Sequence, residues 1–219
     1  MKKNWWKALA VLIFIYVIFQ GMLGTVPRLP ILNESIRNVY FHVPLWFSMI
    51  ILLVASLVYA VRYLRKGRID DDRISVEFAN TAILFGVLGC LTGSMWANYT
   101  WGDPWPNDPK LNSVAVGMLL YFAYLILRGS FDDEQRRARI SSVYNIFAFA
   151  VFIPLIIILP RLTDSLHPGN GGNPAFGEYQ MTGQMRLVLY PSVIALTLIG
   201  VWITELRVRL RRLKASVEE

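Results

Sequence analysis

The sequence predicts an all-α integral membrane protein in which six helices cross the bilayer and both termini lie in the cytoplasm. Of its 219 residues 55% are hydrophobic and only 17% are charged, and the mean hydropathy is +0.43. A membrane-spanning helix needs about 17 to 25 apolar residues. Six stretches meet or approach this length, at approximately 5–23, 43–63, 78–97, 113–127, 140–159 and 187–204. We expect them to form one membrane domain over residues 1–219.

The basic residues alternate between the connections and thereby predict the orientation. The connections that would share a side with the termini hold seventeen of the 22 Lys and Arg residues. The other side holds only five, which are Arg28, Arg37, Lys110, Arg161 and Arg186. Because cytoplasmic loops gather Lys and Arg, the termini are expected inside and the 98–112 loop outside. Membrane topology thus explains the net charge of +7, and we expect no nucleic-acid partner.

The first three stretches carry several local signals. A basic start before an apolar run resembles a secretory signal, but 5–23 is long and no Ala-x-Ala site follows it, so we expect a retained helix. Pro44 suits the first turn of the second helix, which would put His42 just before that helix at the outer surface. In the third stretch, small residues recur at intervals of four and permit close helix packing; these are Gly86, Cys90 and Ser94, with Gly89 and Gly93 beside them.

Later signals concern the connections and the fifth helix. The charged segments 64–76 and 129–139 are expected to be solvated inner loops. Pro154 is expected to kink the fifth helix, where neighbouring groups must satisfy the freed carbonyl. The C-terminal segment 207–214 is expected to be a basic amphipathic extension that contacts anionic membrane lipid.

The segment 96–113, which joins the third and fourth stretches, is rich in aromatic residues. It contains Trp96, Trp101 and Trp105, three of the seven tryptophans, together with Gly102 and three prolines. Proline removes donors and fixes φ, so we expect a rigid loop without helix or strand. Such a surface suits a large, flat, apolar ligand. The alternative is an aromatic belt that anchors helix ends at the membrane interface.

The polar residues limit the possible chemistry. All fifteen acidic residues fall outside the centres of the spans, whereas proton pumps and ion-coupled carriers keep ionisable groups at mid-membrane. The only two histidines, His42 and His167, both fall on outer segments, and two neutral imidazoles can fill the two axial positions of a haem iron. Cys90 is the only cysteine, so covalent haem attachment through Cys-x-x-Cys-His is excluded.

Three ordered motifs resemble one known family. The segment Trp101-Gly102-Asp103-Pro104-Trp105-Pro106-Asn107-Asp108 resembles the Trp-Gly-x-x-Trp-x-Trp-Asp signature of the haem-handling membrane proteins of cytochrome c maturation. Tyr40-Phe41-His42-Val43-Pro44 and Ser165-Leu166-His167 resemble the two histidine segments of the haem exporter protein C (CcmC) type. Asn107 departs from the pattern, because the family usually has a third tryptophan there and an amide offers less stacking area.

The resemblance implies a non-enzymatic protein of the bacterial cytoplasmic (inner) membrane that acts in cytochrome c-type biogenesis. Such a protein holds haem b without covalent bonds at the outer, periplasmic face and delivers it to a periplasmic haem chaperone. The ATP-binding-cassette transporter subunits of the maturation complex are further implied partners. The expected site residues are His42 and His167 as axial ligands, with Trp96, Trp101, Gly102, Trp105 and Asp108 forming the platform.

Two other functions remain open at the level of sequence. One is a haem redox subunit like cytochrome b, a design that buries its histidines within helices, whereas here both are expected in loops. The other is a haem-free structural or transport protein whose aromatic residues only anchor it. A haem absorption spectrum of the purified protein would separate the haem-free protein from the two haem-binding functions, delivery and electron transfer.

Overall fold

The computed structural model describes residues 4–29, 31–167 and 181–218 of the chain. The longer helices are α1 (Trp5–Leu23), α2 (Val39–Lys66), α3 (Ile69–Trp101), α4 (Pro109–Gly129), α5 (Glu134–Ile153) and α7 (Gly183–Glu218). Shorter elements are the 3₁₀ helix η1 (Asn33–Asn38), the π-helical turn η2 (Pro154–Ile158) and α6 (Leu159–Leu162). Six helical stretches are long and apolar enough to cross a membrane, which confirms the predicted number of spans.

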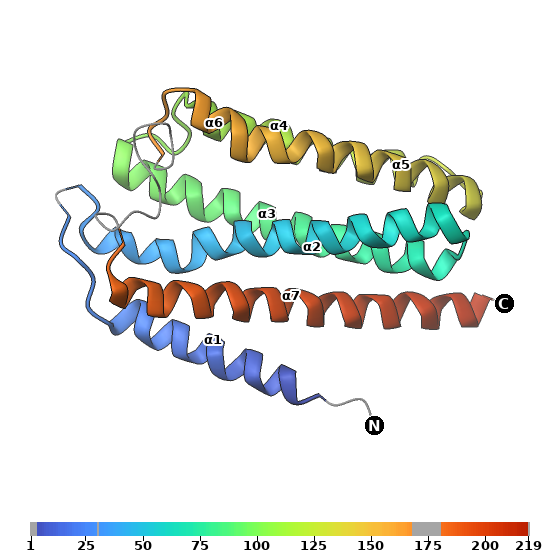
Figure 1. Cartoon of the computed structure of the whole chain (residues 1–219), viewed down its shortest axis with the longest axis horizontal. Coiled ribbons are helices and arrows are strands. Elements are labelled where there is room, and N and C mark those ends of the chain that lie inside the picture. Colours follow the sequence, from blue (N-terminus) through green and yellow to red (C-terminus); the bar gives the residue numbers. More distant parts are fainter. Residues whose placement is uncertain (1–3, 30, 168–180, 219) are drawn as a thin grey trace.

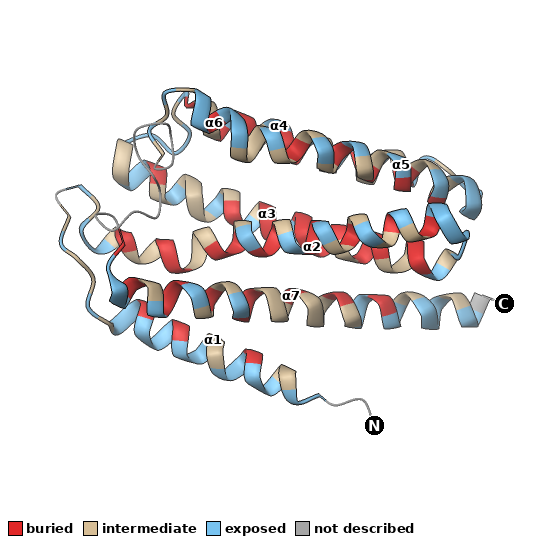
Figure 2. Cartoon of the chain, viewed as in Figure 1, coloured by how far each residue is buried: buried red, intermediate tan, exposed pale blue. Residues whose placement is uncertain are grey.

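The helices lie side by side along one axis (Figure 1). Helices α2 and α3 occupy the centre, α4 and α5 cover one side of them, and α7 and then α1 cover the other. Burial follows this order: 56% of the apolar window of α3 is buried, against 17% of that of α1 (Figure 2). The start of α1 and the end of α7 point toward one end of the bundle, which we call the terminal end. The end of α1, the start of α2, the α3–α4 connection, α6 and the start of α7 lie at the other, which we call the loop end.

The connection between α2 and α3 is much shorter than the expected loop 64–76. Only Gly67 and Arg68 separate the two helices, and Gly67 ends α2 with φ 66°, where its N–H donates to the Tyr63 carbonyl at 2.7 Å. The following acidic residues, Asp70 to Asp72, form the first turn of α3. Carboxylates are stabilised at a helix N-terminus, so a run that was expected to be a solvated loop instead begins a helix. Likewise α5 begins at Glu134, within the expected loop 129–139.

The proline-containing segments differ from the expectations in extent. Helix α3 continues to Trp101 and α4 begins at Pro109, so the irregular segment is 102–108 rather than the whole of 98–112. The expectation that no helix enters the aromatic segment was therefore wrong for residues 96–101. Pro154 does interrupt the regular helix, because α5 ends at Ile153 and one π-helical turn follows.

His42 lies inside a helix, and the expectation of a loop position was wrong. Pro44 is the sixth residue of α2 and cannot donate to the Tyr40 carbonyl four residues earlier. The Ser192 hydroxyl of α7 donates to that carbonyl instead, at 2.5 Å. Because a neighbouring helix satisfies the freed group, α2 can start before its proline and include His42.

Candidate functional site

The His42 ring lies between α2 and α3, in space left by a missing side chain. A Cβ placed on Gly93 would lie 2.6 Å from His42 Cε1, and one on Gly89 would lie 2.8 Å from the Trp46 indole. Both distances are shorter than real Cβ contacts allow. The expected small-residue face of α3 therefore serves close packing, as predicted, and two of its glycines accommodate these rings.

The polar contacts of His42 favour one tautomer. Its Nδ1 lies 3.1 Å from the Gly89 carbonyl oxygen and 3.2 Å from Thr92 Oγ1. A carbonyl oxygen only accepts, so Nδ1 carries the hydrogen and Nε2 keeps a lone pair. Metal-bound histidines in proteins commonly donate their second N–H in this way, which fixes the ring. The Nδ1 contacts thus fix the His42 ring and leave Nε2 as the nitrogen with a lone pair.

Asp108 is a buried carboxylate that joins two connections at the loop end. It caps α4 by accepting hydrogen bonds from the N–H groups of Lys110 at 2.9 Å and Leu111 at 3.3 Å. It also accepts from the Ser165 hydroxyl at 2.9 Å and from the Leu166 N–H at 2.7 Å. Burial raises the pKa of Asp108, but these hydrogen bonds outweigh burial and the net shift is downward. Asp108 is therefore an anion that holds residues 165–167 against the start of α4.

His167 sits beside this carboxylate and against an indole. Its ring centroid is 4.9 Å from that of Trp101, and its Nδ1 is 3.5 Å from Asp108 Oδ1. Burial and the positive charge of Lys110 lower the pKa of His167 to about 4, although the Asp108 carboxylate raises it. A protonated His42 would also lower this pKa. At neutral pH His167 is an uncharged imidazole.

Of the remaining expected site residues, Trp96 contacts one of these two rings, whereas Trp105 and Gly102 belong to the loop that follows α3. Trp96 lies edge-on to His42 with centroids 6.0 Å apart, and its Nε1 donates to Ser35 Oγ at 3.2 Å. Trp105 is 38% exposed at the loop end. Gly102 ends α3, and its N–H donates to the Asn98 carbonyl. Its φ of 77° is an angle that glycine adopts readily and other residues rarely do, so the backbone itself explains the glycine at this position. Asn107 accepts a hydrogen bond from Asn112 at 2.9 Å.

The family model described as Heme exporter protein C matches residues 1–219, the whole chain. The chain belongs to the haem exporter protein C family. A Heme exporter protein C of Bradyrhizobium diazoefficiens is 28% identical over 136 residues, which are 62% of this chain and 51% of that protein. The Escherichia coli K12 protein of the same name is 24% identical over 208 residues, 93% of this chain and 81% of that protein. The matched region thus spans about half of the first relative and most of the second.

In this member of the haem exporter protein C family, the structure brings together the residues that sequence reasoning singled out. His42, Trp96, Trp101, Asp108 and His167 all belong to the loop end. Sequence reasoning missed three supporting residues, namely Gly93, Thr92 and Ser165. Gly93 was noted only as part of a small-residue face, and Ser165 only as part of a motif. Their contacts depend on helix register and on the approach of distant segments, which a single sequence does not specify.

Proposed function

We propose that the chain binds haem b without covalent bonds at its loop end, with His42 and His167 as the two axial ligands. Membership of the haem exporter protein C family supports a role in haem handling for cytochrome c biogenesis. The observation that carries the ligand assignment is the position of the chain's only two imidazoles at the same end of the bundle, His42 near the start of α2 and His167 against Trp101 at the end of α3. Both are neutral donors suited to haem iron.

The surrounding residues fit a haem ring and its edge. Trp101 offers aromatic surface next to His167, and Trp105 exposes part of its side chain in the loop that follows; such surfaces contact conjugated rings by offset or edge packing. Lys110 is the cation whose charge reaches His167, so it is the best placed partner for a propionate. Arg37 suits this role less, because its guanidinium donates to the Gly21 and Gly24 carbonyls at the end of α1. The single cysteine, Cys90, leaves no thioether attachment to be made by a Cys-x-x-Cys-His motif.

We assign the loop end to the outer, periplasmic face of a bacterial inner membrane. The seventeen-to-five distribution of basic residues supports this orientation. A ligand held at an exposed end of a bundle can leave it for another protein, so we propose delivery of haem to a periplasmic haem chaperone. The ATP-binding-cassette subunits of the maturation complex are the other proposed partners.

The decisive experiment is the absorption spectrum of the detergent-purified protein. We expect a haem band in the wild type, and a weakened and shifted band in both His42→Ala and His167→Ala. Tyr99→Ala is a matched control, because Tyr99 is a 78% exposed aromatic residue at the same end. A wild-type protein without haem after reconstitution would contradict haem binding, and unchanged spectra in both histidine variants would contradict the ligand assignment.

The position of His42 inside α2 favours a second candidate function, a haem redox subunit like cytochrome b. The bound haem would then exchange electrons rapidly with a quinone. Transfer of haem to an apo-chaperone, without such exchange, would favour delivery.

A further inference from the structure

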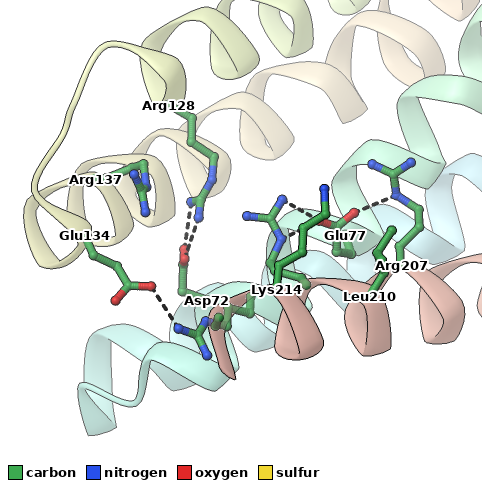
Figure 3. Close-up of a pocket in the computed structure, with 11 residues that line it drawn as sticks. Asp72, Glu77, Arg128, Glu134, Arg137, Arg207, Leu210 and Lys214 are labelled. Atoms are coloured by element: carbon green, nitrogen blue, oxygen red, sulfur yellow. Dashed lines mark hydrogen bonds and ion pairs between the residues drawn. The ribbon is translucent and has the colours of Figure 1, made fainter. Parts of the chain in front are cut away.

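A cleft of about 440 Å³ opens at the terminal end of the bundle, far from the histidines. The start of α3, the end of α4, the start of α5 and the last turns of α7 form its walls (Figure 3). We call it the basic cleft after its six cations, which are Arg73, Arg128, Arg137, Arg207, Arg211 and Lys214. Three carboxylates also line it, those of Asp72, Glu77 and Glu134.

The carboxylates are fully engaged by some of these cations. Arg128 donates two hydrogen bonds to Asp72, at 2.8 and 2.5 Å. Glu77 accepts from Arg207 and from Arg211, each at 2.6 Å, so that one negative charge faces two guanidinium groups. Arg73 is paired with Glu134 at 3.2 Å. Three positive charges of the lining are left without a balancing carboxylate in the cleft.

Two side chains carry most of this surplus. Arg137 donates to the Phe131 carbonyl at 3.4 Å, a neutral group. Lys214 extends into the cleft beside Glu77 (Figure 3), and within the described part of the chain it forms no ion pair. A concave site with surplus Lys and Arg charge suits a phosphate group, which accepts several charge-assisted hydrogen bonds.

The apolar surface beside the cleft indicates what carries the phosphate. Leu206, Leu210, Leu213 and Val217 recur at intervals of four, three and four, which puts them on one face of α7. They are 51, 54, 64 and 85% exposed, and Leu210 also lines the cleft. A free anion gains nothing from this apolar surface, whereas a lipid can cover its part nearest the membrane, at Leu206 and Leu210.

The length of α7 brings the stripe to the right depth. Its 36 residues correspond to about 54 Å at 1.5 Å per residue, while the hydrocarbon core is only about 30 Å thick. The last turns, which line the cleft, therefore extend beyond the hydrocarbon core to the level of the headgroups, and Leu206, the first residue of the stripe, lies nearest to the span 187–204. We propose that the basic cleft binds the phosphodiester headgroup of an anionic phospholipid, whose glycerol and first acyl carbons contact the start of this stripe at Leu206 and Leu210 before the chains enter the hydrocarbon core.

The test measures lipid binding to the detergent-purified full chain by native mass spectrometry, with phosphatidylglycerol and phosphatidylcholine as probes. Arg137→Gln/Lys214→Gln removes two cations that no carboxylate of the cleft depends on. We expect it to weaken phosphatidylglycerol binding by about tenfold or more, since each basic residue near a lipid surface contributes measurably. Arg65→Gln/Lys66→Gln is the matched control at the end of α2, with the same loss of charge outside the cleft, and it should change binding by less than about twofold.

Three results would overturn the proposal. Equal losses in the two double variants would reduce the effect to general surface charge. Equal binding of phosphatidylglycerol and phosphatidylcholine would remove the anionic specificity. Displacement of the bound lipid by millimolar inorganic phosphate would identify a free anion as the ligand. The haem band of the double variant should match that of the wild type, because its residues lie at the end opposite the histidines.

Discussion

Buried carboxylates have different partners at the two ends of the bundle. At the terminal end, Asp71, Asp72 and Glu77 are buried carboxylates, and each is paired with at least one arginine. At the loop end, the buried Asp108 accepts hydrogen bonds from hydroxyl and N–H donors. The distance from His167 Nδ1 to Asp108 Oδ1 is 3.5 Å, which is long for a hydrogen bond. Ion pairs fix the first end, while the second keeps ring nitrogens available for a ligand. The terminal end thus neutralises its buried charges in ion pairs, whereas the loop end satisfies its carboxylate with neutral donors, which suits the haem site that we propose there.

The largest expected effect belongs to the terminal end. Asp72→Asn leaves the Arg128 guanidinium buried without its counter-charge, which should cost about 3 to 5 kcal/mol of unfolding free energy. Asp70→Asn breaks an exposed pair with Arg212 and should cost at most about 1 kcal/mol. Denaturant unfolding in detergent, followed by circular dichroism, measures both. Similar stability of the two variants would mean that burial of the Asp72–Arg128 pair has no energetic consequence.

At the loop end, Gly93→Ala should displace the His42 ring. The new methyl group would lie 2.6 Å from Cε1, and overpacking of this kind costs about 1 to 3 kcal/mol. We expect weaker haem binding in a titration followed by absorption. Gly129→Ala is the control, since a Cβ there meets nothing within 4 Å. Unaltered haem affinity in Gly93→Ala would show that the ring position does not matter for binding.

Asp108→Asn should loosen the segment that carries His167. An Asn side chain still caps α4, but its amide N–H₂ cannot accept from the Leu166 N–H, and an unsatisfied buried donor costs about 1 to 2 kcal/mol. Haem affinity should fall, with little change in helix content. Asp103→Asn serves as the comparison, because Asp103 accepts only a local hydrogen bond from the Trp105 N–H in the same loop. Equal affinities of the two variants would refute a positioning role for Asp108.

The smallest effect concerns pH. The pKa of His167 is lowered from 6.5 to about 4, so the imidazole stays neutral as the pH falls from 8 toward 5. Haem retention by the wild type should therefore be flat over this range and decline only as the pH approaches 4. The positive charge of Lys110 lowers this pKa, so Lys110→Met should raise the pKa and move the decline to higher pH. Lys214→Met, at the terminal end, should leave the profile unchanged, and a wild-type decline centred near pH 6.5 would contradict this account.

The sequence predicted the elements that depend on composition and failed where tertiary contacts decide. Apolar length was enough to count the six spans. The bounds of α2 and α3 were wrong, because Ser192 satisfies the carbonyl freed by Pro44 and arginines from other helices pair with Asp70, Asp71 and Asp72. Those partners lie far away along the chain, so local reasoning treated the proline as a helix start and the acidic run as a loop.

For the candidate site, too, the residues were predicted from the sequence, but the contacts between them were not. Both histidines and the three tryptophans of the site, Trp96, Trp101 and Trp105, were singled out from residue type and motif. The structure places them at the loop end of the bundle. The links between them were not predicted, since the Asp108 contact with Ser165 spans 57 residues and that of His42 with Gly89 spans 47. His42 occupies a helix and not a loop, so the distinction from a cytochrome b-like protein rests on function rather than on position.

The two histidines lie in different kinds of backbone structure. His42 belongs to a helix turn wedged against α3, whereas His167 belongs to a non-helical segment tied down mainly through one carboxylate. If haem is bound as proposed, the two ligands would therefore be released at different cost. His167 would be the ligand that a small backbone movement could withdraw, while His42 would keep its position and hold the haem for a receiving protein.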